Sequence, residues 1–192
     1  VPAPLPRPAV GGCASPSGGG WATPGSAFGD WTDAIVAPPA GLASGDIGMM
    51  GEMLFVYYGL PPADPRMDDY WALAAKYDVP VAVHINRGPP PGAPPRGEGC
   101  CPNFDDDIGN PALLRPVLEN HPTLRIYMQH AGADAPPQSG EPNYEQETFA
   151  LMRDYPQVYV DMSITNSLYD EQSHRAALQS FITAGFADRI MF

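Results

Sequence analysis

The chain has 192 residues, of which 44% are hydrophobic and 10% aromatic, a composition that supports one packed domain or part of one. It carries 22 acidic and 10 basic residues, and the net charge of −12 argues against a nucleic-acid partner or an anionic membrane surface. No apolar run approaches the roughly 20 residues of a membrane span. The composition therefore excludes nucleic-acid binding and membrane spanning as primary roles.

The three cysteines form neither a CxxC pair nor an even disulfide framework, because Cys100 and Cys101 are adjacent and Cys13 is far away. We expect free thiols, which favours the cytoplasm over an oxidising compartment. The chain begins at Val1 rather than Met, without the charged start and apolar core of a signal peptide. We expect the true N-terminus to be missing, so the location cannot be fixed from it.

Residues 1–30 consist mostly of Pro, Gly, Ser and Ala, a composition that cannot offset the entropy of ordering its backbone by burial. We predict a loop or linker there, followed by one domain over residues 31–192. Residues 31–44 predict at most a helix interrupted by Pro38 and Pro39.

The first regular unit is a strand at residues 47–55, a helix at 68–77 and a second strand at 79–85. The first strand, IGMMGEMLF, is apolar enough to be covered on both faces, with Glu52 near its end. Tyr70, Leu73, Ala74 and Tyr77 follow helical spacing. The pattern predicts a right-handed βαβ unit.

The next unit begins after a Gly/Pro-rich loop at residues 86–109, a length typical of a functional lid or a disordered insertion. Asn110 is expected to cap a helix with Pro111 in its first turn and a kink at Pro116. Its buried stripe should consist of Leu113, Leu114, Val117 and Leu118. A strand at residues 124–129 follows.

The alternation continues with a helix at residues 143–154, with Phe149 and Met152 inward, and a strand at 158–162. A last helix at 170–186, packed through Ala177, Leu178, Phe181 and Ile182, leads to a strand beginning at residue 189. Five strands alternate with four helices. The sequence therefore predicts an α/β fold with a parallel sheet.

Glu52, His84 and His130 each lie at or near the end of a predicted strand. In parallel α/β folds the carboxyl ends of the strands form the ligand crevice, so these side chains should converge there. Imidazole and carboxylate suit a divalent cation, zinc first and manganese as the alternative, which lowers the pKa of a bound water toward neutrality. Each of the three residues, taken alone, also has a purely structural explanation. Either histidine can be one whose hydrogen bonds are satisfied within the fold, and Glu52 can be a carboxylate paired with an arginine.

Other polar residues are less informative. Asp161, also at a strand end, either joins the site or caps the following turn, while His121 and His174 are expected at the surface. The run at 105–107 should be a solvated loop, since it lacks the spacing of an EF-hand. There is no GxSxG elbow, no Walker loop and no GxGxxG after a strand.

Several of these segments together resemble the amidohydrolase superfamily, in its amidohydrolase-related branch of metal-dependent hydrolases and decarboxylases. They are MGEM at Glu52, VPVAVHI at His84, NPALLRPVLENHPTLRIYMQHAG at His130, DYPQVYVDMS at Asp161 and ADRIMF at the end. The resemblance implies a (β/α)8 TIM barrel with a divalent metal centre and a small-molecule substrate. It makes His84 a metal ligand, His130 a second metal ligand or a catalytic residue that polarises substrate and water, and Glu52 a strand-four carboxylate ligand.

Two pieces of that family pattern are missing from this sequence: the first-strand HxH pair and the aspartate that usually follows the last strand. The chain thus resembles a partial barrel of about strands four to eight. We expect metal-activated water to attack an amide, ester or lactone carbonyl. Decarboxylation of a small acid and a catalytically incomplete remnant are the alternatives. We also expect the chain alone to be inactive, to bind metal weakly and to self-associate through unpaired strand edges.

Overall fold

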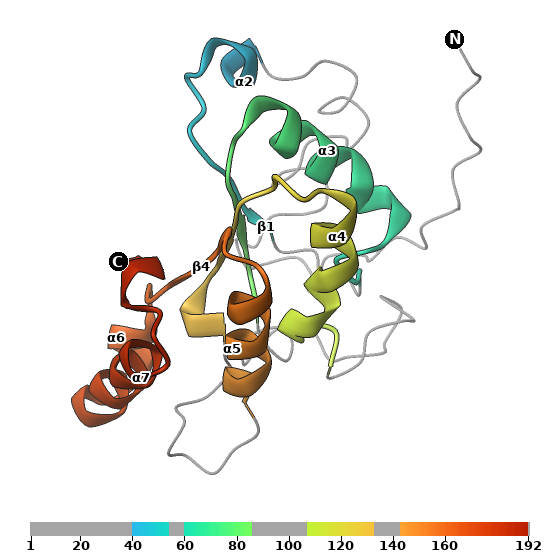
Figure 1. Ribbon diagram of the computed structural model, residues 1–192. Coiled ribbons are helices and arrows are strands. Elements are labelled where there is room, and N and C mark those ends of the chain that lie inside the picture. The colour runs from blue at the N-terminus through green and yellow to red at the C-terminus, as the bar shows by residue number, and fades with distance from the viewer. Residues whose placement is uncertain (1–39, 54–59, 86–106, 133–142, 192) are drawn as a thin grey trace, which may run out of the picture.

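The computed structural model describes residues 40–53, 60–85, 107–132 and 143–191 (Figure 1). The linker predicted at residues 1–30 and most of the loop predicted at 86–109 lie outside these ranges. No helix in the described ranges combines the length and the apolar character needed to cross a membrane.

A five-stranded sheet forms the centre of the described part. Its strands are β1 (Met50–Met53), β2 (Val81–Val83), β3 (Ile126–Met128), β4 (Val158–Asp161) and β5 (Ile190–Met191). All neighbours are parallel and follow chain order, β1-β2-β3-β4-β5. Sequential parallel strands joined through helices are the pattern of a (β/α) barrel. The predicted α/β partial barrel is confirmed, as an open sheet whose described edges are β1 and β5.

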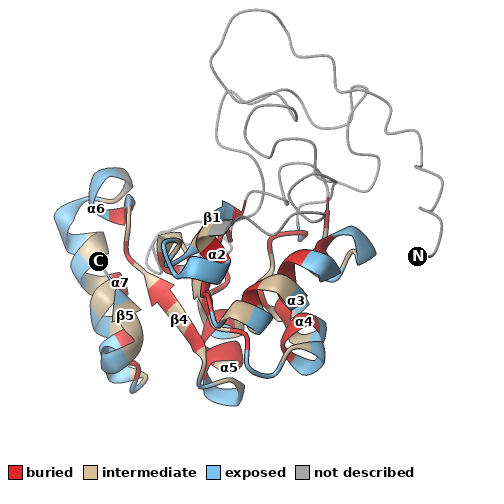
Figure 2. Ribbon diagram, turned by 90° about the horizontal axis from the view of Figure 1, so that it is seen from above, coloured by how far each residue is buried: buried red, intermediate tan, exposed pale blue. Residues whose placement is uncertain are grey.

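The sheet has one face packed on helices and one more open face. Val81, Ile126 and Val158 share one row of the register and are fully buried, as are the residues two positions further along each of these strands. On the opposite face, Tyr127 and Tyr159 stack with ring centroids 5.0 Å apart. Helices α3 (Asp68–Tyr77), α4 (Arg115–Asn120) and α5 (Glu145–Asp154) lie beside the sheet (Figures 1 and 2), and their buried residues form one hydrophobic core with the buried strand residues.

Strand β1 differs from the expectation that both of its faces are apolar and covered. Met53 is buried, whereas Gly51 and Glu52 are exposed. As a described edge strand, β1 has only one hydrogen-bonded neighbour, so its second half can present a polar side chain.

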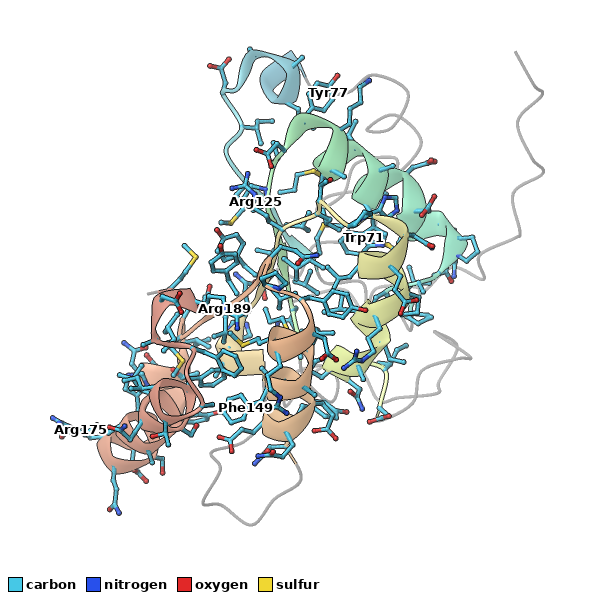
Figure 3. All side chains as sticks on the ribbon, in the orientation of Figure 1. Trp71, Tyr77, Arg125, Phe149, Arg175 and Arg189 are labelled. Carbon is cyan, nitrogen blue, oxygen red and sulfur yellow. The ribbon has the colours of Figure 1, made fainter. Side chains whose placement is uncertain are left out.

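Helix α3 (Asp68–Tyr77) has the predicted bounds. The indole of Trp71 is buried between α3 and α4, and its Nε1 donates to the Pro62 carbonyl at 2.9 Å (Figure 3). The helix ends at Asp78, which adopts a left-handed conformation (φ 51°).

The segment after Asn110 is a 3₁₀ turn (Pro111–Leu114) followed by α4 (Arg115–Asn120). Asn110 caps it as predicted, accepting from the backbone N–H of Ala112 at 2.9 Å. The kink expected at Pro116 is wrong, because Pro116 lies in the first turn of α4, where no backbone donor is needed. Leu113 was also wrongly placed, since its side chain faces outward in the 3₁₀ turn and is 37% exposed.

The remaining helices are α2 (Ala40–Ser44), α5 (Glu145–Asp154), α6 (Thr165–Leu168) and α7 (Glu171–Thr183). Phe149 (Figure 3) and Met152 of α5 are buried as predicted. Phe149 contacts Phe181 of α7 edge to face. Ile182 was wrongly expected inward and is 43% exposed. The short α6 was not predicted.

Candidate metal centre

Three successive strands bring Glu52, His84 and His130 together at the carboxyl edge of the sheet. Glu52 lies in β1, His84 directly follows β2, and His130 is the second residue after β3. Glu52 Oε1 lies 2.5 Å from His84 Nδ1 and 3.2 Å from His130 Nε2, and the two ring nitrogens are 3.1 Å apart. The predicted convergence of these side chains is confirmed, whereas their role as metal ligands stays a prediction.

Backbone hydrogen bonds between the strands hold the three residues in register. The His84 N–H donates to the Met53 carbonyl at 3.1 Å, and the Gln129 N–H donates to the Val83 carbonyl at 2.9 Å. His84 is buried, with 7% of its side chain exposed, whereas His130 and Glu52 expose 17% and 33%. His84 therefore forms the buried inner end of the cluster, and His130 and Glu52 form its accessible side.

Gly51 allows β1 to approach β2 at this point. A Cβ atom on Gly51 would lie 2.5 Å from the Ala82 carbonyl oxygen, and its φ of +129° disfavours any residue with a side chain. This supporting role of Gly51 was not predicted from the sequence. Its signal was a glycine inside an apolar strand, which often marks a close backbone approach.

A tight left-handed turn follows β3. His130 and Ala131 both have positive φ, 59° and 62°, although neither is glycine. Non-glycine residues held in this region cost about 1 kcal/mol or more each and concentrate at functional sites. This turn lies where the apolar run of LRIYMQHAG ends at a histidine.

The loop after β4 contacts the far side of the His130 ring. His130 Nδ1 donates to the Ser163 carbonyl oxygen at 3.2 Å, and the Ser163 hydroxyl lies 3.5 Å from the same nitrogen. Asp161 Oδ1 accepts from the Ser163 backbone N–H at 2.7 Å. Of the two roles left open for Asp161, the structure shows the turn-capping one.

The cluster shifts the acid–base properties of its members. Hydrogen bonds from His130 and then His84 lower the pKa of Glu52 to about 2, against the opposing effect of burial. Burial would lower the pKa of His130, but the hydrogen bond to Glu52, the Ser163 carbonyl and the nearby carboxylates together raise it above its ordinary value. Without a cation, the arrangement therefore favours an ionised Glu52 facing a protonated His130.

The three donor atoms fit a divalent cation. One atom from each residue forms a group within 4.8 Å. Zinc ligands at about 2.1 Å in a tetrahedral arrangement lie about 3.4 Å from one another, close to the distances between His130 Nε2 and the other two donors. Only the short hydrogen bond between Glu52 and His84 would have to lengthen. Three protein ligands with a free position are the donor set of catalytic zinc sites.

The other candidate residues lie outside this cluster. His121 pairs with Asp68 at 2.9 Å, and His174 Nδ1 bonds the Thr165 hydroxyl at 3.0 Å. Both imidazoles are half-buried and bonded to these partners, and neither belongs to the cluster. Of the acidic run at 105–107, only Asp107 is described.

An open hollow between α5 and α7 contains none of the cluster residues. It is lined by Phe149, Ala176, Gln179, Ser180, Thr183 and Ala184, none of them ionisable. It offers no acid–base or metal chemistry.

Two solved structures resemble the chain at low identity. One is 2,6-dihydroxybenzoate decarboxylase complexed with 2,6-dihydroxybenzoate (17% identity, TM-score 0.37), and the other is 2,6-dihydroxybenzoate decarboxylase from Rhizobium (16% identity, TM-score 0.36). Each match covers 69% of this chain, which spans 45% of the length of those chains.

No curated protein matches this sequence. The amidohydrolase family model matches residues 48–192, a range that contains the whole sheet and all three residues of the cluster. The chain therefore belongs to the amidohydrolase family.

Proposed function

We propose that this chain contributes the metal centre of a hydrolase that cleaves an amide, ester or lactone bond, with zinc as the preferred cation and manganese as the alternative. The observation that carries the proposal is the convergence of Glu52, His84 and His130 from three successive strands within 4.8 Å. A bound divalent cation supplies a Lewis acid that lowers the pKa of water and polarises a carbonyl oxygen.

The surroundings of the three residues suggest different roles. His84 is buried and held by the strand ladder, so it serves as the fixed ligand of the cluster. Glu52 provides the negative charge that offsets the charge of the cation. His130 is more exposed and lies on the accessible side, which suits proton transfer to or from a substrate.

Decarboxylation is the alternative chemistry, and it requires a cation that holds the substrate carboxylate. Among the described residues, the arginine ion pairs are made with other carboxylates, at Arg66, Arg115, Arg125 and Arg175. Arg189 donates to backbone carbonyls instead. These five arginines are engaged elsewhere and give decarboxylation no support; Arg87 lies outside the described ranges.

Metal binding tests the first half of the proposal. Zinc and manganese are titrated by calorimetry into metal-free protein, unchanged and carrying His84→Ala, with His121→Ala as the matched control. We expect His84→Ala to weaken binding strongly and His121→Ala to bind as the unchanged protein does, because His121 pairs only with Asp68 among the contacts described. Equal affinity in the His84→Ala variant would overturn the assignment.

The reaction class is tested on the full-length gene product loaded with zinc. Aryl esters, anilides and lactones serve as hydrolysis probes, and carbon dioxide release from 2,6-dihydroxybenzoate serves as the decarboxylation probe. Hydrolysis lost in the His84→Ala variant supports the proposal. Carbon dioxide release without hydrolysis would replace it with the alternative.

A further inference from the structure

The loop that follows β4 supports the His130 ring from the side opposite Glu52. Asp161 and Ser163 form a closed turn, since Oδ1 of Asp161 accepts from the Ser163 N–H at 2.7 Å. This turn directs the Ser163 carbonyl oxygen toward His130 Nδ1, 3.2 Å away. The contact joins residues 33 positions apart in the chain.

The continuation of the same loop is anchored in the protein. Thr165 is buried, and its hydroxyl donates to the Met162 carbonyl at 2.7 Å while accepting from His174 of α7. Between these anchors Ile164 adopts a left-handed conformation (φ 62°), which β-branched residues rarely do. The loop is therefore fixed on both sides of the carbonyl that meets His130.

A carbonyl oxygen only accepts hydrogen bonds, so the contact requires the proton on His130 Nδ1. Nε2 faces the Glu52 carboxylate, which also only accepts, so in the metal-free protein this nitrogen donates to Glu52. A cation bound at Nε2 would replace that proton, while Nδ1–H stays on the Ser163 carbonyl. Bonding of the outer ring nitrogen fixes the tautomer and orientation of a metal-binding imidazole, and its loss typically costs 10 to 100-fold in metal affinity.

We propose that Asp161 is a positioning residue that, by holding the turn at Ser163, fixes the orientation of the His130 ring through its Nδ1–H. The consequence for metal affinity rests on the proposed function, whereas the consequence for the Nδ1–H hydrogen bond does not. Two other features of this loop offer alternative explanations for an effect on His130. One is the negative charge of Asp161, and the other is the Ser163 hydroxyl, which lies 3.5 Å from His130 Nδ1.

Three variants separate these explanations. Asp161→Ala removes both the acceptor and the charge. Asp161→Asn keeps an oxygen acceptor for the turn but removes the charge, and Ser163→Ala keeps the backbone carbonyl but removes the hydroxyl. If the turn acts, only Asp161→Ala should change His130, and Asp161→Asn should restore the unchanged behaviour.

The first measurement is nitrogen-15 NMR of the imidazoles in metal-free protein, which detects the hydrogen bond of Nδ1–H through the exchange rate of its proton with solvent. We expect slow exchange of the His130 Nδ1 proton in the unchanged protein, in Asp161→Asn and in Ser163→Ala, and faster exchange in Asp161→Ala. The unchanged protein alone already tests the proposal, since a His130 Nδ1 without a protected proton there would overturn it even if a variant failed to fold.

The second measurement is the zinc affinity of the same four proteins. We expect a loss of about 10-fold or more for Asp161→Ala and near-unchanged affinity for the other two variants. If zinc binds the unchanged protein and Asp161→Ala equally well, with the same exchange rate of the His130 Nδ1 proton, the positioning role fails and the metal site stands. If no protein binds zinc but the exchange rates follow the expected pattern, the metal site fails and the positioning role stands. An Asp161→Asn variant that behaves like Asp161→Ala would show that Asp161 acts through its negative charge and not through the turn, and would overturn the proposal.

Discussion

Glu52 Oε1 lies 2.5 Å from Nδ1 of His84, a residue 32 positions further along the chain. The same oxygen contacts His130 Nε2 at 3.2 Å. A single carboxylate oxygen thus joins two imidazoles from two other strands. Removing the Glu52 carboxylate should therefore break both of these contacts at once.

Replacing Glu52 with Gln should weaken zinc binding by more than roughly 100-fold, the upper end of what the loss of an outer-shell partner costs. The amide is nearly isosteric with the carboxylate but lacks its negative charge. Titration calorimetry on metal-free protein measures the effect, with Glu119→Gln on α4 as the matched control. Equal losses in both variants would point to net charge rather than to a ligand role.

Zinc affinity should rise with pH across the titration of His130. A ligand nitrogen must lose its proton before it binds a metal, and the pKa of His130 is raised above its ordinary value. Glu52, with a pKa of about 2, stays ionised throughout this window. Binding should therefore release a proton below the raised pKa and release fewer above it. Calorimetry in buffers of different ionisation enthalpy measures this proton count, and a count independent of pH would contradict the assignment of His130.

The metal-free protein should show its own pH dependence of stability. The lowered pKa of Glu52 contributes stability that is present above its unfolded pKa and lost as the pH falls toward about 2. The raised pKa of His130 contributes stability that is present below its unfolded pKa and lost as the pH rises through its folded pKa. Both contributions coexist in mildly acidic solution.

Urea unfolding in the presence of a chelator tests this pattern. The free energy of unfolding of the unchanged protein should fall as the pH rises past the folded pKa of His130, and Glu52→Gln should show a smaller fall. The two proteins would have parallel pH profiles if the pair made no ionic contribution.

The sequence predicted the elements whose signals are local. Helix α3 has the predicted bounds because a turn signal and the spacing of Tyr70 and Ala74 act within a few residues of each other. Likewise, His84 and His130 each follow an apolar run, and parallel strands bring the ends of such runs to one edge.

The features that the sequence did not predict depend on register or on very short segments. The contact of His130 with the Ser163 carbonyl leaves no trace in side-chain identity, because every residue carries a carbonyl and only the pairing of β3 with β4 selects this one. Helix α6 has four residues, too few for a periodic pattern. Leu113 fits a helical stripe, but the 3₁₀ turn changes its direction.

Gly51 connects the fold to the site, and Gly51→Ala should damage both. The new methyl group would lie 2.5 Å from the Ala82 carbonyl oxygen and 3.0 Å from the Ala82 Cβ, at a φ of +129°. Since backbone atoms cannot give way as the end of a flexible side chain can, β1 should shift away from β2. We expect a loss of about 2 kcal/mol or more in the free energy of unfolding, together with weaker zinc binding as Glu52 moves away from His84.

Gly48→Ala provides the matched control, because a Cβ at Gly48 would meet nothing within 4 Å. It should leave both the urea midpoint and the zinc affinity near those of the unchanged protein. The two measurements also separate fold from site. A Gly51→Ala protein that is destabilised but binds zinc normally would show that the cluster tolerates a displaced β1. A protein as stable as the Gly48→Ala control would show that the close approach of β1 to Ala82 is not required at all.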